Sequence, residues 1–152
     1  MGAMAASGSQ GLWFLSRGSG LVLLVLFSIV VVLGVATRTG SAPARWPRFA
    51  VAELHRALSL FAVALLALHV ATAILDPFVT IGWAATLLPF ASPYRTLAIG
   101  LGTLAVDLAG AVLLTSLARR RLGQRTWRAV HWLAYLAWPA VRECRNAAGQ
   151  AR

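Results

Sequence analysis

The sequence has 152 residues, of which 59% are hydrophobic and only 12% are charged, whereas about a quarter of the residues of a typical soluble domain are charged. This composition excludes a soluble globular protein and predicts an all-α integral membrane protein with room for one helical bundle. The net charge of +10 comes only from arginines that stand between apolar runs, so the positive-inside rule explains it and we expect no nucleic-acid partner.

Residues 1–10 are small and polar and predict a disordered tail, and we assign the flexible N-terminal tail to 1–19. An apolar run of eighteen residues follows at 20–37. A secretory signal peptide is the alternative interpretation, and it would carry its positive charge before a shorter apolar core. Here Arg17 stands alone before the run, whereas Arg38 and Arg45 follow it. We therefore predict a first transmembrane helix whose C-terminal end faces the cytoplasm.

A second apolar run, at 53–75, carries two of the three histidines of the chain, His55 and His69, and ends at Asp76-Pro77. Ionisable side chains inside a spanning helix are costly and usually mark a site. Fourteen residues bring the two imidazoles to within about 40° of one face and separate them by about 21 Å along the helix. We therefore expect His55 near the cytoplasmic face and His69 near the outer face. Both are candidate ligands that would be completed by residues of another helix.

The next apolar stretch, 78–90, has only thirteen residues, so we predict a short interfacial segment. A third spanning helix is predicted at 96–118. Its small residues Ala98 and Gly102 are four apart, which permits close packing against another helix. Asp107 lies near its middle and should face inward, as a proton relay or, with more weight, as a protonated acid bonded within the bundle.

A fourth spanning helix is predicted at 127–141, after a loop with five arginines that the positive-inside rule places in the cytoplasm. His131 comes near its start, so it should lie at the same depth as His55. A polar C-terminal tail is expected at 142–152. The predicted fold is thus a bundle of four transmembrane helices plus one short interfacial segment, multi-pass in the lipid of the cell membrane, with both termini outside.

Histidines from two helices, without a nearby set of carboxylates or cysteines, argue against zinc and against a di-iron centre. A porphyrin iron needs only two axial ligands, and imidazole is a common one. Arg56, Arg125 or Arg128 could pair with the propionates. For one histidine alone a packing role would be favoured, but the spacing of the first two histidines and the depth of the third favour ligation.

The segments ELHRALSLFAVALLALHV and WRAVHWLAYLAWP resemble the ferric reductase-like transmembrane family, which includes the haem-binding membrane subunit of bacterial methionine sulfoxide reductase and the membrane cores of NADPH oxidases. The likeness covers most of the chain, and we assign the domain to 20–141. The resemblance implies b-type haem held between histidine-bearing helices and electron transfer across the membrane. Carried over, His55 and His131 would ligate an inner haem and His69 one side of an outer haem.

The chain departs from the family pattern at Cys144, where the family normally has a second histidine on the last helix. The resemblance therefore implies one haem, leaves a second one open, and indicates a C-terminally truncated member. As the single cysteine, Cys144 excludes an internal disulfide. Its thiolate is an alternative iron ligand to which we give little weight.

Two functions follow from the sequence. The first is a haem b-binding transmembrane electron-transfer subunit of an oxidoreductase. Because the 152 residues hold no Gly-rich dinucleotide fingerprint, its electrons would come from a quinol or a separate flavoprotein. The second is a non-enzymatic membrane scaffold, or a remnant that no longer binds haem. A transporter is less consistent with the sequence, which has no evident inverted repeat.

Overall fold

The computed structural model describes residues 2–41, 46–76, 83–93 and 95–150, and all regular structure within these ranges is helical. The chain divides into two compact units, Met1–Pro77 and Phe78–Arg152, hereafter unit 1 and unit 2. Three helical segments are long and apolar enough to cross a membrane: Gly11–Thr39, Arg48–Leu75 and Thr96–Arg120. The all-α, multi-pass prediction is confirmed, whereas a fourth span is not found among the described residues.

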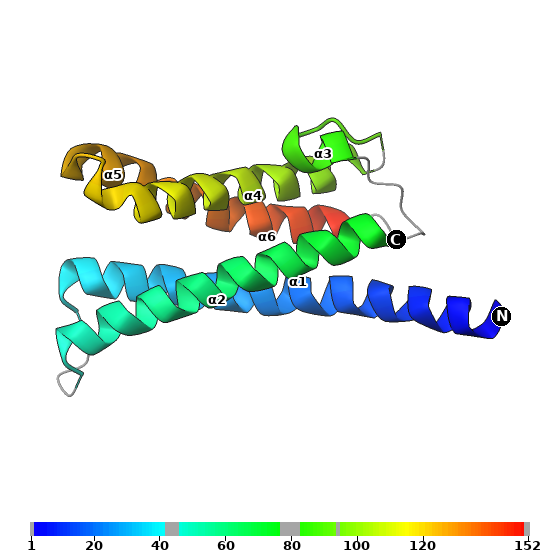
Figure 1. Cartoon of the computed structure of the whole chain (residues 1–152), viewed down its shortest axis with the longest axis horizontal. Helices are drawn as coiled ribbons and strands as arrows, with labels where there is room; N and C mark the ends of the chain where they lie inside the picture. Colours follow the sequence, from blue (N-terminus) through cyan, green and yellow to red (C-terminus); the bar gives the residue numbers. More distant parts are fainter. Residues whose placement is uncertain (1, 42–45, 77–82, 94, 151–152) are drawn as a thin grey trace. The chain divides into compact units, whose positions relative to one another are not determined.

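Unit 1 is an antiparallel hairpin of two long helices, α1 (Gly2–Thr39) and α2 (Arg48–Leu75) (Figure 1). Gly40 ends α1 with a positive φ of 71° and donates its N–H to the Ala36 carbonyl at 3.0 Å, which is a common way to satisfy a last-turn carbonyl. Pro47, extended at φ −66° and ψ 140°, precedes the first residue of α2. With 28 residues, α2 is about 42 Å long and exceeds the roughly 30 Å of a bilayer core.

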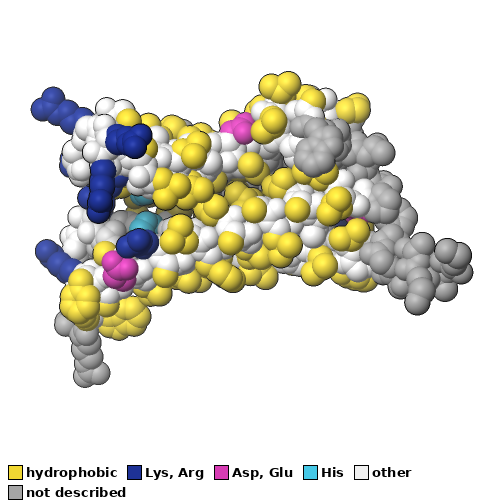
Figure 2. All heavy atoms as spheres, in the orientation of Figure 1, with side chains coloured by type: hydrophobic (Ala, Val, Ile, Leu, Met, Phe, Trp, Pro, Cys, Tyr) yellow, Lys and Arg dark blue, Asp and Glu magenta, His cyan; other side chains and the backbone are white. Residues whose placement is uncertain are grey.

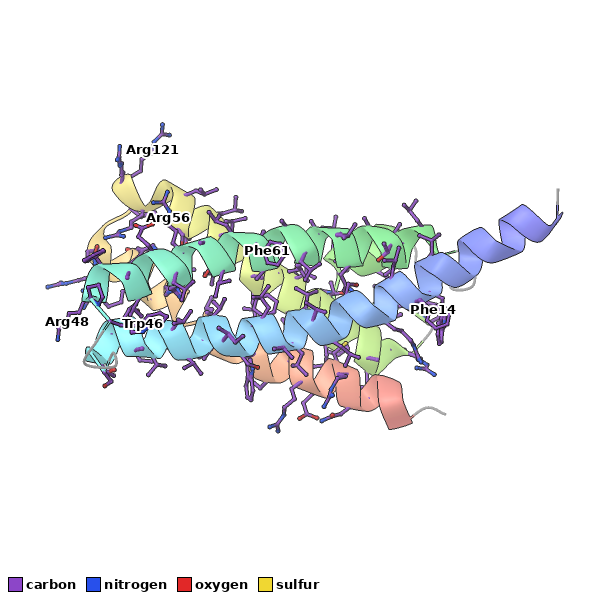
Figure 3. All side chains as sticks on the ribbon, turned by 90° about the horizontal axis from the view of Figure 1, so that it is seen from below. Phe14, Trp46, Arg48, Arg56, Phe61 and Arg121 are labelled. Atoms are coloured by element: carbon purple, nitrogen blue, oxygen red, sulfur yellow. The ribbon has the colours of Figure 1, made fainter. Side chains whose placement is uncertain are left out.

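The helices of unit 1 expose large apolar side chains, as expected for surfaces that face lipid. Phe14 and Val32 are each 65% exposed and Phe61 is 58% exposed. Figure 2 shows hydrophobic side chains along the length of the helices. In Figure 3, Phe61 lies near the middle of α2, while Trp46 and Arg48 lie at the turn.

The N-terminal segment differs from the predicted tail, because α1 begins at Gly2. Its early sequence, GAMAAS, contains alanine and methionine, which are strong helix formers. The apolar run after it supplies a helix that these residues can extend without a new nucleation step.

Unit 2 is built on α4 (Thr96–Leu117), against which the short α3 (Trp83–Leu87) packs. The Thr103 hydroxyl donates to the Ala85 carbonyl at 2.7 Å. Phe90, at a positive φ of 65°, lays its ring against Gly100, where a Cβ would collide with it. The five residues of α3 are too few to span, as predicted; residues 78–82 of that segment lie outside the described residues.

The predicted fourth helix is wrong in its continuity. The chain leaves α4 through the 3₁₀ turn η1 (Ala118–Arg120), then forms α5 (Gln124–His131) and, after a break at Trp132 and Leu133, α6 (Ala134–Gln150). Hydrogen bonds tighten at the break, where the Leu133 N–H reaches the Val130 carbonyl three residues back at 2.9 Å. Pro139 does not lie at the break but inside α6, so the break is a local change to the tighter i→i+3 hydrogen bond and not a proline effect.

The last helix, α6, runs back along α4 within unit 2 (Figure 1). The Cys144 thiol donates to the Ala98 carbonyl at 2.9 Å, and a Cβ at Gly102 would lie 3.4 Å from the sulfur. Ala98 and Gly102 therefore form the small-residue contact that their spacing predicts. Residues 142–150, expected as a polar tail, are helical and pack on α4 through Cys144.

Replacing Gly40 by alanine should destabilise unit 1. A positive φ costs an L-residue about 1–2 kcal/mol, and the added Cβ would collide with the Arg48 guanidinium. We expect G40A to lower the free energy of unfolding by about 1–2 kcal/mol in denaturant titrations of the detergent-solubilised protein. Gly18→Ala is the control, because Gly18 is helical and has open space around it. Equal stability of the two variants would contradict this account of the turn.

Reporter fusions test the orientation. The basic segments at the α1–α2 turn and after α4 should face the cytoplasm. Because α6 runs back along α4, a reporter joined after residue 152 should be active only outside, and one inserted at residue 43 only inside. A cytoplasmic C-terminus would overturn the predicted arrangement.

Candidate functional site

His55 of α2 is seated on the backbone of α1. Its Nδ1 lies 3.0 Å from the Val30 carbonyl oxygen. A Cβ built on Gly34, one turn further along α1, would come within 3.2 Å of the ring carbon Cε1. Only a glycine lets the imidazole lie this close to α1 without displacement.

His69 repeats this arrangement near the other end of the hairpin. Its Nδ1 lies 2.9 Å from the Ser19 hydroxyl oxygen, and that hydroxyl donates to the Ser16 carbonyl at 3.1 Å. A Cβ on Gly20 would again come within 3.2 Å of the imidazole Cε1. We call the two sets the Gly34–His55 level and the Gly20–His69 level.

The acceptors on α1 determine which ring nitrogen carries the proton. A carbonyl oxygen only accepts, so His55 must donate Nδ1–H to Val30. The Ser19 hydroxyl lies within hydrogen-bond distance of both the Ser16 carbonyl and Nδ1 of His69; when its single hydrogen goes to Ser16, it accepts Nδ1–H from His69. In both neutral rings the lone pair that a metal would need is then on Nε2.

A heptad pattern explains why both imidazoles face α1. One series of residues along α2, with alternating steps of four and three, contains both histidines and all three buried residues of the helix. Its members are Val51, His55, Leu58, Ala62, Leu65, His69 and Thr72. Such a series repeats every 3.5 residues and keeps one seam facing a neighbouring helix. Fourteen residues are two heptads, so the predicted 40° offset between the histidines disappears when the helices supercoil.

His131 is the last residue of α5, in unit 2. Its ring stacks on Trp127, with centroids 5.0 Å apart and an interplanar angle of 25°. The Trp127 indole N–H reaches the Ser116 hydroxyl of α4 at 3.4 Å, and the Arg119 guanidinium lies over the indole at 4.8 Å. His131 is thus held near the basic end of α4, and the prediction that it lies at the depth of His55 stays a prediction.

The predicted propionate partners are both exposed: Arg56 on α2, near the turn in Figure 3, and Arg128 on α5. His55, His69 and Arg56 share one unit, while His131 and Arg128 belong to the other. The pairing of His55 with His131 stays a prediction. Among the described residues, no group of three or more His, Cys, Asp or Glu could hold a metal ion.

Two further polar residues of the sequence have defined surroundings in unit 2. The Cys144 thiol is committed to the Ala98 carbonyl on α4, which favours packing over iron ligation. Asp107, expected inward, is exposed on the surface of unit 2. The expectation that Asp107 faces inward is therefore not met within unit 2.

The family model of the ferric reductase like transmembrane component matches residues 19–141. The chain belongs to this family. No curated protein and no solved structure matches it. Domains of this family are membrane-embedded, contact lipid, are generally associated with haem and work with redox partners, so membership indicates a membrane electron-transfer function.

The sequence predictions missed the α1 side of the site: Gly20, Gly34, Ser19 and the Val30 carbonyl. One signal could have found the glycines. Gly20 and Gly34 are fourteen residues apart, as are His55 and His69, and equal spacings face each other level by level in an antiparallel hairpin.

The single cysteine gives a direct test of the α4–α6 contact. A maleimide should label Cys144 much more slowly in the native protein than in the chain unfolded in detergent, because its thiol is bonded to α4. Gly102→Leu should accelerate native labelling by displacing the sulfur. Gly110→Leu, at a position with open space within 4 Å in the described residues, should leave the rate unchanged. Native labelling as fast as in the unfolded chain would disprove the contact.

Proposed function

We propose that this protein is a haem b-binding electron-transfer subunit, which passes electrons across the membrane from a quinol or a separate flavoprotein. The observation that carries the proposal is the 3.0 Å contact between the Nδ1 of His55 and the Val30 carbonyl. It leaves the lone pair of the neutral ring on Nε2, and metal-bound histidines usually donate their other ring N–H to a backbone carbonyl or a carboxylate in this way.

His55 and His131 are the proposed axial ligands of an inner haem, and the exposed Arg56 and Arg128 are proposed to pair with its propionates. Bound haem would supply a one-electron carrier in the apolar bundle. The heptad seam of α2 would hold the first imidazole, and the stacked Trp127 the second. Family membership supports this assignment at the level of the domain.

An outer haem would have only one histidine in this chain, His69, because the sequence contains three histidines in all. The hydrogen bond from the Cys144 thiol to the Ala98 carbonyl argues against Cys144 as the second ligand of an outer haem. The proposal is therefore one complete haem site per chain. The alternative function is a membrane scaffold without haem, in which the Val30 contact would only satisfy the buried imidazole of His55.

A dithionite-reduced minus oxidised spectrum of the purified protein tests the proposal. We expect a b-type signal that disappears in His55→Ala and in His131→Ala, because each variant removes one axial ligand. His69→Ala is the matched control, since it removes an imidazole from the same helix but should retain the signal.

Helical content by circular dichroism should be the same in all three variants, which separates loss of haem from loss of fold. No signal in a folded wild-type protein supplied with haem would refute the proposal and favour the scaffold. A signal that survives in both His55→Ala and His131→Ala would refute the ligand pair.

A further inference from the structure

We propose that α1 carries two positioning devices, each made of a glycine and an oxygen acceptor, that orient His55 and His69 for ligation through Nε2. The devices are Gly34 with the Val30 carbonyl, and Gly20 with the Ser19 hydroxyl. This inference rests on the proposed haem function for its purpose, but its geometry lies entirely within unit 1.

The glycines determine how far each ring stands from α1. An added Cβ would meet Cε1 at 3.2 Å at both levels, so the imidazole would have to move by a few tenths of an ångström. Gly11 and Gly18, on the same helix, have open space around them within 4 Å in the described residues. The close approach is therefore a property of these two glycines and not of α1 as a whole.

The acceptors determine how each ring is rotated and where its proton sits. The Val30 carbonyl oxygen and the Ser19 Oγ lie 3.0 and 2.9 Å from the two Nδ1 atoms. At the Gly20–His69 level the hydroxyl passes the contact on to the Ser16 carbonyl. Ser16 precedes Gly20 by four residues, just as Val30 precedes Gly34. Both levels thus end on equivalent carbonyls, one directly and one through a hydroxyl.

The repetition has a consequence for the Gly20–His69 level. Any imidazole inside a span needs a polar partner, so the acceptor alone does not assign a role to His69. The assignment rests on the recurrence of both parts in register, a glycine that lets the ring approach α1 and an oxygen acceptor at Nδ1. His69 is therefore oriented to present Nε2 in the same way as His55.

The tautomers are measurable without haem. We would label the histidines of the full-length, haem-free protein with ¹⁵N in lipid nanodiscs and record the protonation of each ring nitrogen by NMR. His55 and His69 should both carry the proton on Nδ1. His55→Ala and His69→Ala spectra assign the signals.

Three variants then separate the two levels. Ser19→Ala should broaden or reverse the tautomer preference of His69 and leave His55 unchanged. Gly34→Ala should perturb the His55 signals and leave His69 unchanged. Gly18→Ala, the matched control on α1, should leave both unchanged.

Haem affinity gives the second readout. Gly34→Ala should push the His55 ring away from its Val30 partner. Because loss of the hydrogen-bond partner of a metal-bound histidine typically weakens metal binding by about 10- to 100-fold, this variant should bind haem about tenfold more weakly than Gly18→Ala. Proton on Nε2 of either ring in the wild type, or equal spectra of Gly34→Ala, Ser19→Ala and Gly18→Ala, would overturn the positioning role. If the wild type takes up no haem, the proposed function fails, while the tautomer pattern still decides the geometry inferred here.

Discussion

The packing of the His55 and His69 imidazoles against two glycines of α1 is the constraint that determines how the two helices of unit 1 pair. An ionisable ring inside a span is tolerated only if its polar atoms find partners within the protein. α1 supplies these partners through a backbone carbonyl at Val30 and a hydroxyl at Ser19, and at both places a glycine lets the ring lie close to the helix. The contacts at Gly20 and Gly34 therefore set the distance between α1 and α2 at two depths. Hydrophobic packing alone would leave that distance free, since the outer faces of both helices are equally apolar and meet lipid.

The position of each helix could be predicted from the sequence where local chemistry decides it. Proline after Asp76 ends α2, and the small pair Ala98 and Gly102 receives α6 as their spacing predicts. The break after His131 could not be predicted with the same tools. It is a local change to an i→i+3 hydrogen bond at Leu133, and the apolar pattern runs through it without a change.

The candidate site was predictable on one side only. Histidines are conspicuous in an apolar helix, so His55, His69 and His131 could be selected at once. Their partners on α1 are a backbone carbonyl, a serine and two glycines, which are residue types that occur throughout membrane helices. The two glycines become recognisable as partners only when the helices are paired antiparallel, because their fourteen-residue spacing then matches that of the two histidines. A carbonyl acceptor such as that of Val30 has no sequence signature at all.

The same register bears on electron transfer across the bilayer. His55 and His69 are about 21 Å apart along α2, so a carrier at one level alone reaches only part of the way through a roughly 30 Å core. The pairing of His55 with His131 is a proposal, whereas Cys144 of α6 donates its thiol hydrogen to the Ala98 carbonyl of α4. Yet the Gly20–His69 level retains its glycine and its hydroxyl acceptor. The glycine and the hydroxyl acceptor at this level hold the His69 ring close to α1, with Nδ1 at the acceptor. The Gly34–His55 level has the same geometry, so both levels of the hairpin hold the imidazole in the same way.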